Sequence, residues 1–264
     1  MTRLLSCLLL TALPVPAAMR VLVTVVEQKS GRPIQNLTAQ DFTVFEDKLV
    51  RRVDAAEFSS KPVDVMLLVD TSLVGGIVQG VASSLIGQLQ EKEQMSVVSF
   101  DSSAELMQDY TSSKQLLMAA LGKVRYGNSP RVLDALFAAM DGGFEHAAFR
   151  RVILLVTAGV EGHSRATERE VVRMARKNSV SIYPVYAAGA GRSLFENLAR
   201  QTGGASFQLR DMQKTGNKEP AARVFEVVRS HYTLTLPGNL GLTDKVKVEV
   251  KRTDKLSVSA LPLD

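Results

Sequence analysis

From residue 63 onward the chain alternates between short apolar runs and longer amphipathic stretches, and no other feature constrains its fold as strongly. Apolar runs of strand length, rich in β-branched residues, lie at residues 63–69, 95–100, 152–156 and 181–187. Stretches with helical periodicity lie at residues 78–91, 113–124, 132–144, 167–178 and 193–202. Strands that are apolar at nearly every position must be covered on both faces, which is typical of parallel sheets joined by helices. The pattern therefore predicts an α/β fold: a doubly wound, mostly parallel sheet with helices on both faces.

The segments that flank this region show the period-two alternation of antiparallel strands. On the N-terminal side it covers residues 20–26, 43–46 and 53–58. On the C-terminal side a last helix near residues 221–230 leads into residues 231–236, 245–251 and 256–260. We expect these strands to pair as a small flanking β unit. The resulting division is a signal peptide at residues 1–18, an N-terminal β segment at 19–60, an α/β domain at 61–220, and a C-terminal helix and strands at 221–264 that pack with the N-terminal segment.

The first 18 residues have the features of a secretory signal. Arg3 supplies the positive charge, residues 4–13 are apolar, and small residues precede a cleavage site near Ala17 or Ala18. The apolar run is shorter than the roughly 20 residues that a membrane-spanning helix needs. Cys7 is the single cysteine, so cleavage would leave a chain without thiols or disulfides. We therefore expect a secreted or periplasmic protein with no membrane span.

Composition and motif spacing argue against several other classes of protein. The net charge of +5 comes from scattered basic residues, and the chain has no Trp and only 6% aromatic residues, so the basic stripe and stacking platform of a nucleic-acid-binding protein are missing. The three histidines, His146, His163 and His231, lack the spacing of a zinc site. The glycines at 189 and 191 lack the third glycine of a dinucleotide-binding loop. We expect neither a nucleic-acid partner nor a cofactor.

The loop after the first apolar run carries a family resemblance, because ligands of open α/β sheets bind at the carboxyl ends of the strands. The segment VMLLVDTS at residues 65–72 resembles the opening strand and metal-site loop of a von Willebrand factor type A domain. Residues 95–100, 132–136 and 152–159 are similar to later segments of that Rossmann-like domain. Residues 30–47 and 231–237 are similar to the ends of the VWFA-related proteins of acidobacteria. Together the resemblance covers nearly all of the chain after the signal peptide.

The resemblance implies a metal-ion-dependent adhesion site, built in adhesive members from Asp-x-Ser-x-Ser, a Thr and a second Asp. Asp70 and Ser72 match the first two ligands, but the third position is Val74 and the second acidic position is Ala158. The threonine position falls near Pro130, with Ser129 beside it. Since Mg²⁺ and Ca²⁺ require several oxygen ligands, we expect Asp70 and Ser72 to be the remnant of a degenerate site that holds no tightly bound ion.

Two alternatives to this view of the site stay open. Glu161 or Asp101 would have to turn toward Asp70 to replace a missing oxygen ligand. Asp70 would otherwise cap the turn that follows it, as Asp commonly does in loops.

An enzymatic interpretation depends on Ser164, which lies in a Gly-x-Ser-x-Ala sequence ahead of Asp211 and His231, in the order of a serine hydrolase. Ser164 lies several residues beyond the end of its strand, whereas a nucleophile elbow places the serine directly at the strand end. We therefore expect no enzyme.

The remaining hypothesis is a protein-binding module. We expect its partner-binding face to include Asp70, Ser72, Asp101, Ser129 and Glu161, and its partner to be another exported protein. The alternative is a structural element that self-associates by strand addition through its β unit.

Overall fold

The computed structural model describes residues 18–187, 189–214, 219–238 and 246–263. The predicted signal peptide, with Cys7, lies outside these residues except for Ala18, where the first strand begins. Among the described residues no helix is both long and apolar enough to cross a membrane.

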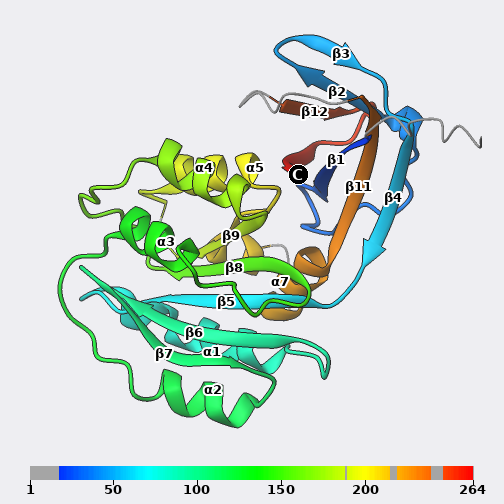
Figure 1. Ribbon diagram of the computed structural model, residues 1–264. Coiled ribbons are helices and arrows are strands. Elements are labelled where there is room, and N and C mark those ends of the chain that lie inside the picture. The colour runs from blue at the N-terminus through cyan, green and yellow to red at the C-terminus, as the bar shows by residue number, and fades with distance from the viewer. Residues whose placement is uncertain (1–17, 188, 215–218, 239–245, 264) are drawn as a thin grey trace, which may run out of the picture.

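A six-stranded sheet with the strand order β10-β9-β8-β5-β6-β7 forms the centre of the molecule (Figure 1). Strands β5, β6, β8, β9 and β10 run parallel, and β7 pairs antiparallel with β6. The strands are β5 (Val63–Asp70), β6 (Gln94–Phe100), β7 (Ala104–Thr111), β8 (Arg150–Thr157), β9 (Val180–Tyr186) and β10 (Phe207–Gln208). The predicted doubly wound, mostly parallel sheet is confirmed.

Helices cover both faces of this sheet, and the side chains of β5 divide between them. Val65, Leu67 and Val69 belong to one hydrophobic core, and Met66 and Leu68 belong to the other. The first core is closed by α1 (Gln79–Gly87), α2 (Lys114–Leu121) and α7 (Pro220–Arg229), and the second by α3 (Val132–Met140), α4 (Glu168–Lys177) and α5 (Arg192–Gln201). A 3-10 turn, η2 (Gly75–Val78), precedes α1, and α6 (Leu209–Lys214) follows β10. We call residues 63–229 the α/β unit.

The sequence analysis predicts neither a strand nor a helix between residues 101 and 112, where the structure has β7. It is an edge strand, and its polar and apolar residues do not alternate regularly, because its pairing with β6 shifts register at two places. Edge strands with bulges bury less of each residue, so their apolar pattern is weak.

The flanking β unit (residues 18–60 and 230–263) consists of two antiparallel sheets. One has the order β13-β1-β11-β4 and the other β12-β2-β3. Its strands are β1 (Ala18–Glu27), β2 (Phe42–Glu46), β3 (Leu49–Arg51), β4 (Ala55–Ser60), β11 (Ser230–Pro237), β12 (Val246–Val250) and β13 (Leu256–Leu263), with the 3-10 turn η1 (Ala39–Asp41) before β2. Tyr232 lies in its core, stacks edge-on against Phe42 and Phe58, and donates its hydroxyl to the Ile34 carbonyl. The predicted pairing of the two chain ends is thus observed.

Helix α7 differs in its packing from the pattern read in the sequence, which grouped residues 221–264 with the N-terminal segment. Val224, Phe225 and Val228 of α7 are buried in the core of the α/β unit, which Val26 of the N-terminal segment also joins. The strands after α7 pair with strands of the N-terminal segment.

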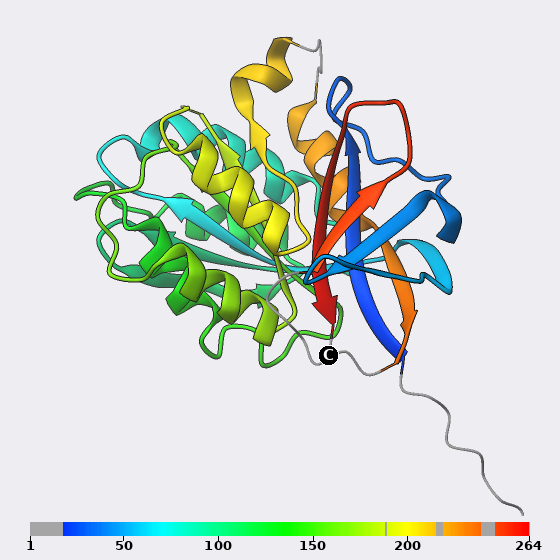
Figure 2. The ribbon, with the colours of Figure 1, turned by 90° about the horizontal axis from the view of Figure 1, so that it is seen from above.

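Strand β13 (red) is the strand of the four-stranded sheet that lies next to the α/β unit (Figure 2). The two units meet where Thr24 donates its hydroxyl to the Gly203 carbonyl at 2.7 Å, and where Ser259 donates to the Gly204 carbonyl. The loop at Gly204 packs directly on β9: a Cβ at residue 204 would lie 1.9 Å from the Ile182 carbonyl oxygen, so this position requires glycine.

Candidate functional site

The loops after β5, β6 and β8 meet at one edge of the six-stranded sheet and are tied together through their main chains. Thr71 donates both its amide and its hydroxyl to the Phe100 carbonyl, at 2.7 and 3.0 Å. The amide of Leu73 donates to Asn128, and that of Gly162 to Pro130. The loops that the sequence indicated as a binding face are therefore neighbours in space.

Asp70, the last residue of β5, accepts three hydrogen bonds with its carboxylate. Oδ1 accepts from the Ser72 amide at 2.9 Å, so Asp70 caps the turn that follows it. Oδ2 accepts from the Thr157 hydroxyl at 2.8 Å and from the Ala158 amide at 2.9 Å. Asp70 is 0% exposed, and its hydrogen bonds join the ends of β5 and β8.

The turn after Asp70 is packed tightly against it. A Cβ at residue 75 would lie 2.1 Å from the Asp70 carbonyl oxygen and 3.0 Å from Oδ1, so glycine is required there. Ser72 is also 0% exposed, and its hydroxyl has no hydrogen-bond partner among the described residues. Neither Asp70 nor Ser72 reaches the surface in this structure.

The other three positions of the implied metal site offer no side-chain oxygen. Val74 is 48% exposed, Ala158 contributes only its amide to Asp70, and Pro130 accepts the Gly162 amide with its carbonyl. Ser129, beside Pro130, is exposed. The donor set is thus one carboxylate, already hydrogen-bonded on both oxygens, and one hydroxyl, which does not fit the octahedral oxygen shell of Mg²⁺. Among the residues that the structure describes, no group of three His, Cys, Asp or Glu could hold a metal ion.

Asp101, one of the two substitute ligands considered, has local partners of its own. Its Oδ2 accepts from the Asn128 side chain at 2.7 Å and its Oδ1 from the Ser103 amide at 3.1 Å. Partial burial alone would raise the pKa of Asp101, but these hydrogen bonds outweigh it and lower the pKa below its ordinary value. Asp101 thereby links the loop after β6 to the loop before α3.

Glu161, the other substitute, holds the start of α3. Its Oε2 accepts from the Val132 amide at 2.9 Å and the Leu133 amide at 3.3 Å, and its Oε1 accepts from the Ser164 amide at 2.9 Å. The first amides of a helix lack partners within the helix, and a carboxylate at that end also interacts favourably with the positive end of the helix dipole. Glu161 therefore serves as a cap supplied from another loop.

The three residues of the hydrolase alternative each have separate partners. The Ser164 hydroxyl accepts from the amides of Leu133 and Asp134, at 3.1 and 3.2 Å, so it also caps α3. Asp211 lies on α6, 3.7 Å from the Arg192 guanidinium. His231 lies in β11 and contacts the Arg229 carbonyl through Nδ1. No hydrogen bond between these three side chains is found in the described part of the chain.

Sequence reasoning gave no role to Thr157 or Asn128, although both position loops of this face. Thr157 immediately precedes Ala158, so its place at the end of a strand was the available signal. Asn128 has a positive φ of 56°, a conformation that Asn tolerates better than most residues, and a glycine before it was the hint of a turn.

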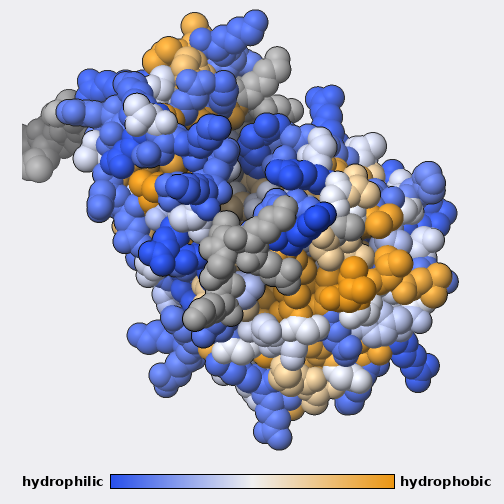
Figure 3. All heavy atoms as spheres, turned by 180° about the vertical axis from the view of Figure 1, so that it is seen from behind, coloured by the Kyte–Doolittle hydropathy of each residue, from blue (hydrophilic) through white to orange (hydrophobic). Residues whose placement is uncertain are grey.

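Large apolar side chains stand out from the turn after Asp70. Leu73 is 79% exposed and Ile77 is 65% exposed, next to Val74. Viewed from behind, the molecule shows an area of apolar surface among hydrophilic neighbours (Figure 3). The turn therefore presents carbon to solvent, while its polar groups point inward.

Comparisons with known proteins identify the family and support the fold. A family model, the von Willebrand factor type A domain, matches residues 64–219. No curated protein matches the chain.

Solved structures similar to the chain include proximal thread matrix protein 1 from the mussel byssus, at 16% identity and a TM-score of 0.54, covering 74% of this chain and 51% of that one. A second structure of that protein has zinc in its metal-ion-dependent adhesion site (MIDAS) motif. Its TM-score is 0.53 at 16% identity, over 69% of this chain and 49% of that one. An aerotolerance-related membrane protein from Bacteroides fragilis has a TM-score of 0.46 at 13% identity, over 60% of this chain and 98% of that one. The chain spans about half the length of the mussel protein, and at these identities the likeness is one of fold.

Proposed function

The chain belongs to the von Willebrand factor type A family, and from that premise we propose that it is an exported, non-catalytic protein-binding module that recognises its partner without a bridging metal ion. Modules of this fold present the loops at the carboxyl ends of their strands to ligands. Export is supported by the leader-like sequence of residues 1–18 and by the absence of cysteine after Cys7.

The observation that carries the metal-independent part is the Asp70 carboxylate. Asp70 is the one carboxylate at the five positions of the site, and it already accepts three hydrogen bonds, from Ser72, Thr157 and Ala158. A carboxylate offers about four lone-pair positions, so at most about one is left for an ion. The main-chain amide of Ala158 stabilises Asp70 at the position where the family has its second acidic residue. The site is thus a degenerate one, in which hydrogen bonds replace the ion that would hold the loops.

The exposed apolar side chains of Leu73, Val74 and Ile77 are the natural contact points for a partner. They stand on a turn that Asp70 and Gly75 hold rigid, so little ordering entropy opposes binding. Apolar groups on a pre-organised surface mark interaction sites more often than isolated exposed residues do.

Metal titration of the purified full chain tests the metal-independent part. We expect Mg²⁺, Ca²⁺ and Mn²⁺ to give no saturable heat and no rise in melting temperature, because an ion that binds only the folded state must stabilise it. The matched variant is Ser72→Ala, which removes a buried hydroxyl without a partner and should leave stability unchanged or slightly higher. Saturable binding that Ser72→Ala abolishes would contradict the proposal.

Photo-crosslinking in the cells that make the protein tests partner binding. A photoreactive residue at Leu73 or Ile77 should give a specific adduct that survives EDTA, whereas one at Leu49, equally exposed on β3, should not give that adduct. Loss of the adduct in EDTA would indicate a metal-bridged contact. Adducts at Leu49 alone would place the interface on the β unit.

A further inference from the structure

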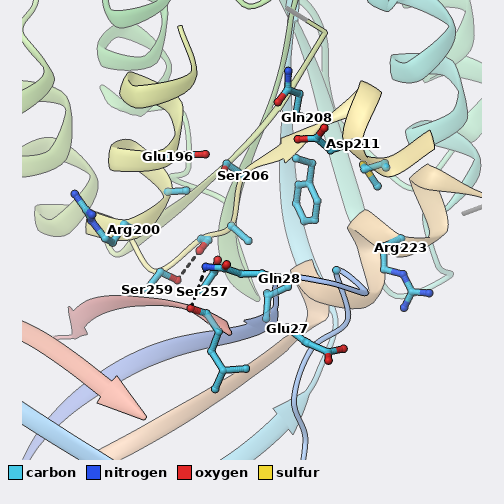
Figure 4. A pocket seen from close by; sticks show the side chains of 18 of the residues that line it. Glu27, Gln28, Glu196, Arg200, Ser206, Gln208, Asp211, Arg223, Ser257 and Ser259 are labelled. Carbon is cyan, nitrogen blue, oxygen red and sulfur yellow. Dashed lines mark hydrogen bonds between the residues drawn. The ribbon is translucent and has the colours of Figure 1, made fainter. Parts of the chain in front are cut away.

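A cavity lies between the α/β unit and the flanking β unit, at the β10 edge of the six-stranded sheet. It lies beside the edge strand β13 of the flanking β unit. Its volume is about 670 Å³. Phe207, Gln208 and Asp211 line it from the α/β unit, and Leu256 to Ser259 of β13 line it from the β unit. Figure 4 shows Gln208 and Asp211 on one side and Ser257 and Ser259 on the other. Strand β13 is the last strand of its sheet, so one of its edges has no partner strand among the described residues.

The hydrogen bonds of β1 determine which main-chain groups of β13 point away from the sheet. Glu27 donates its amide to Arg32, and Val25 accepts the Ile34 amide, so both residues direct their main-chain groups away from β13. Glu27 is opposite Leu256, and Val25 is opposite Val258. In an antiparallel pair, both residues of a non-hydrogen-bonded pair point outward. Leu256 and Val258 therefore direct their amides and carbonyls to the open edge.

Two further observations agree with this alternation. The Gln28 amide donates to the Lys255 carbonyl at 2.9 Å, so the neighbouring pair is the hydrogen-bonded one. Pro262, which has no amide hydrogen, occupies an outward position, where a strand tolerates proline. On the open edge the Gln28 side chain donates to the Leu256 carbonyl at 3.3 Å. The outward amide and carbonyl of Val258 have no partner within the described residues.

The walls of the cavity suit a strand better than a charged small molecule. Phe207, Met212 and Val26 are each more than nine-tenths buried and give an apolar floor. Three acidic and three basic side chains line the cavity, and Arg192 already pairs with Glu196 at 2.7 Å. The net charge of the lining is therefore zero and selects neither an anion nor a cation. At one end the cavity is closed where Ser259 bonds to Gly204.

We propose that this cavity binds an extended segment of a partner polypeptide, which adds as a strand to the open edge of β13 between Leu256 and Ser259. Main-chain hydrogen bonds to Val258 would give affinity, and alternate side chains of the segment would contact the apolar floor at Phe207 and Met212. The open edge spans four residues, about 13 Å of extended chain. The segment is therefore short, uncharged on balance, and apolar at every second residue. This site is separate from the Asp70 loops, so it stands or fails independently of the proposed function.

The test begins with a phage-displayed library of short random peptides selected on the full chain. We expect enriched peptides with apolar residues at alternate positions, whose affinity is then measured by fluorescence anisotropy. Val258→Pro removes the outward amide without removing a hydrogen bond to β1, and it should weaken these peptides about tenfold or more. Val258→Ala, which keeps the amide, is the matched control and should bind nearly as the wild type.

Hydrogen exchange on the unaltered chain gives a second measurement that does not depend on folding of a variant. In the free protein the Val258 amide should exchange faster than those of Ser257 and Ser259, and an enriched peptide should protect it. Peptides that bind without protecting Val258, or a library that yields none, would overturn the proposal. Concentration-dependent self-association that Val258→Pro abolishes would overturn the proposed occupant in favour of a second copy of the chain.

Discussion

The strand-end face around Asp70 and the open edge of β13 use their polar groups in opposite ways. At the strand ends, the carboxylates of Asp70, Asp101 and Glu161 all accept hydrogen bonds from nearby main-chain or side-chain groups. At β13, the outward main-chain groups of Val258 have no hydrogen-bond partner in the described part of the chain and lie beside a cavity. The acidic residues that the sequence singled out are thus bonded to the chain itself, whereas β13, which carries no motif, directs main-chain groups toward the cavity. The two regions differ more clearly in whether their polar groups already have hydrogen-bond partners than in the residue types that carry those groups.

The largest expected effect is that of Asp70→Ala. Removing the carboxylate leaves the Thr157 hydroxyl and the amides of Ser72 and Ala158 buried without an acceptor, each costing about 1–3 kcal/mol. We expect the free energy of unfolding to fall by about 3–5 kcal/mol in metal-free buffer, measured by urea denaturation. Asp101→Ala, at a partly exposed site, should cost less, about 1 kcal/mol. Equal, small losses for both variants would show that Asp70 does not hold the strand ends together.

The junction between the two units provides a pH-dependent test. Burial, together with the nearby charge of Arg150, lowers the pKa of His231 to about 4. The unfolded chain, with an ordinary histidine pKa near 6.5, binds more protons between these values, so stability should fall as the pH drops from about 6.5 to 4. At about 1.4 kcal/mol per pKa unit the loss is at most about 3.5 kcal/mol.

Urea denaturation at several pH values measures this loss, and His231→Gln is the control. The variant should lack this part of the pH dependence while keeping any due to carboxylates. An unchanged pH profile in His231→Gln would mean that the histidine is already solvated in the folded state.

The smallest effect concerns the cap of α3. Glu161→Ala should lower the free energy of unfolding by about 1–2 kcal/mol, since it removes the acceptor of the first amides of the helix. Glu161→Gln retains an acceptor oxygen and should lose less. Thermal melts with added Mg²⁺ complete the test. If Mg²⁺ raised the melting temperature of one variant and not the other, Glu161 would be a metal ligand and not a helix cap, and the strand-end face would no longer differ from β13 in the way described above.

The α/β core could be predicted in detail because burial on both faces leaves a direct record in the sequence. Every position of β5 from Val63 to Asp70 is buried, and the run that predicted this strand is apolar almost throughout. β7, an edge strand whose pairing with β6 shifts register at two places, leaves neither this pattern nor a regular alternation, so it was not predicted. The candidate residues Asp70, Asp101 and Glu161 lie at the strand ends or on the loops that follow them, and their function stays a prediction. The turn cap by Asp70 was considered from the sequence, but its bonds to Thr157 and Ala158 were not.

The sequence by itself determined the α/β core, the pairing of the two chain ends as a β unit, and the loss of oxygen-bearing side chains at Val74 and Ala158, because each depends only on residue type and periodicity. The tertiary structure alone decided that the Asp70 carboxylate has three hydrogen-bond donors, and that the outward main-chain groups of Val258 have no partner among the residues the structure describes. Asp70 bonds to Thr157, 87 residues away along the chain, and the open edge of β13 follows from hydrogen bonds that β1 makes on its other side. A hydrogen bond depends on distance and direction between groups remote in sequence, and the pattern of apolar residues carries no information about either.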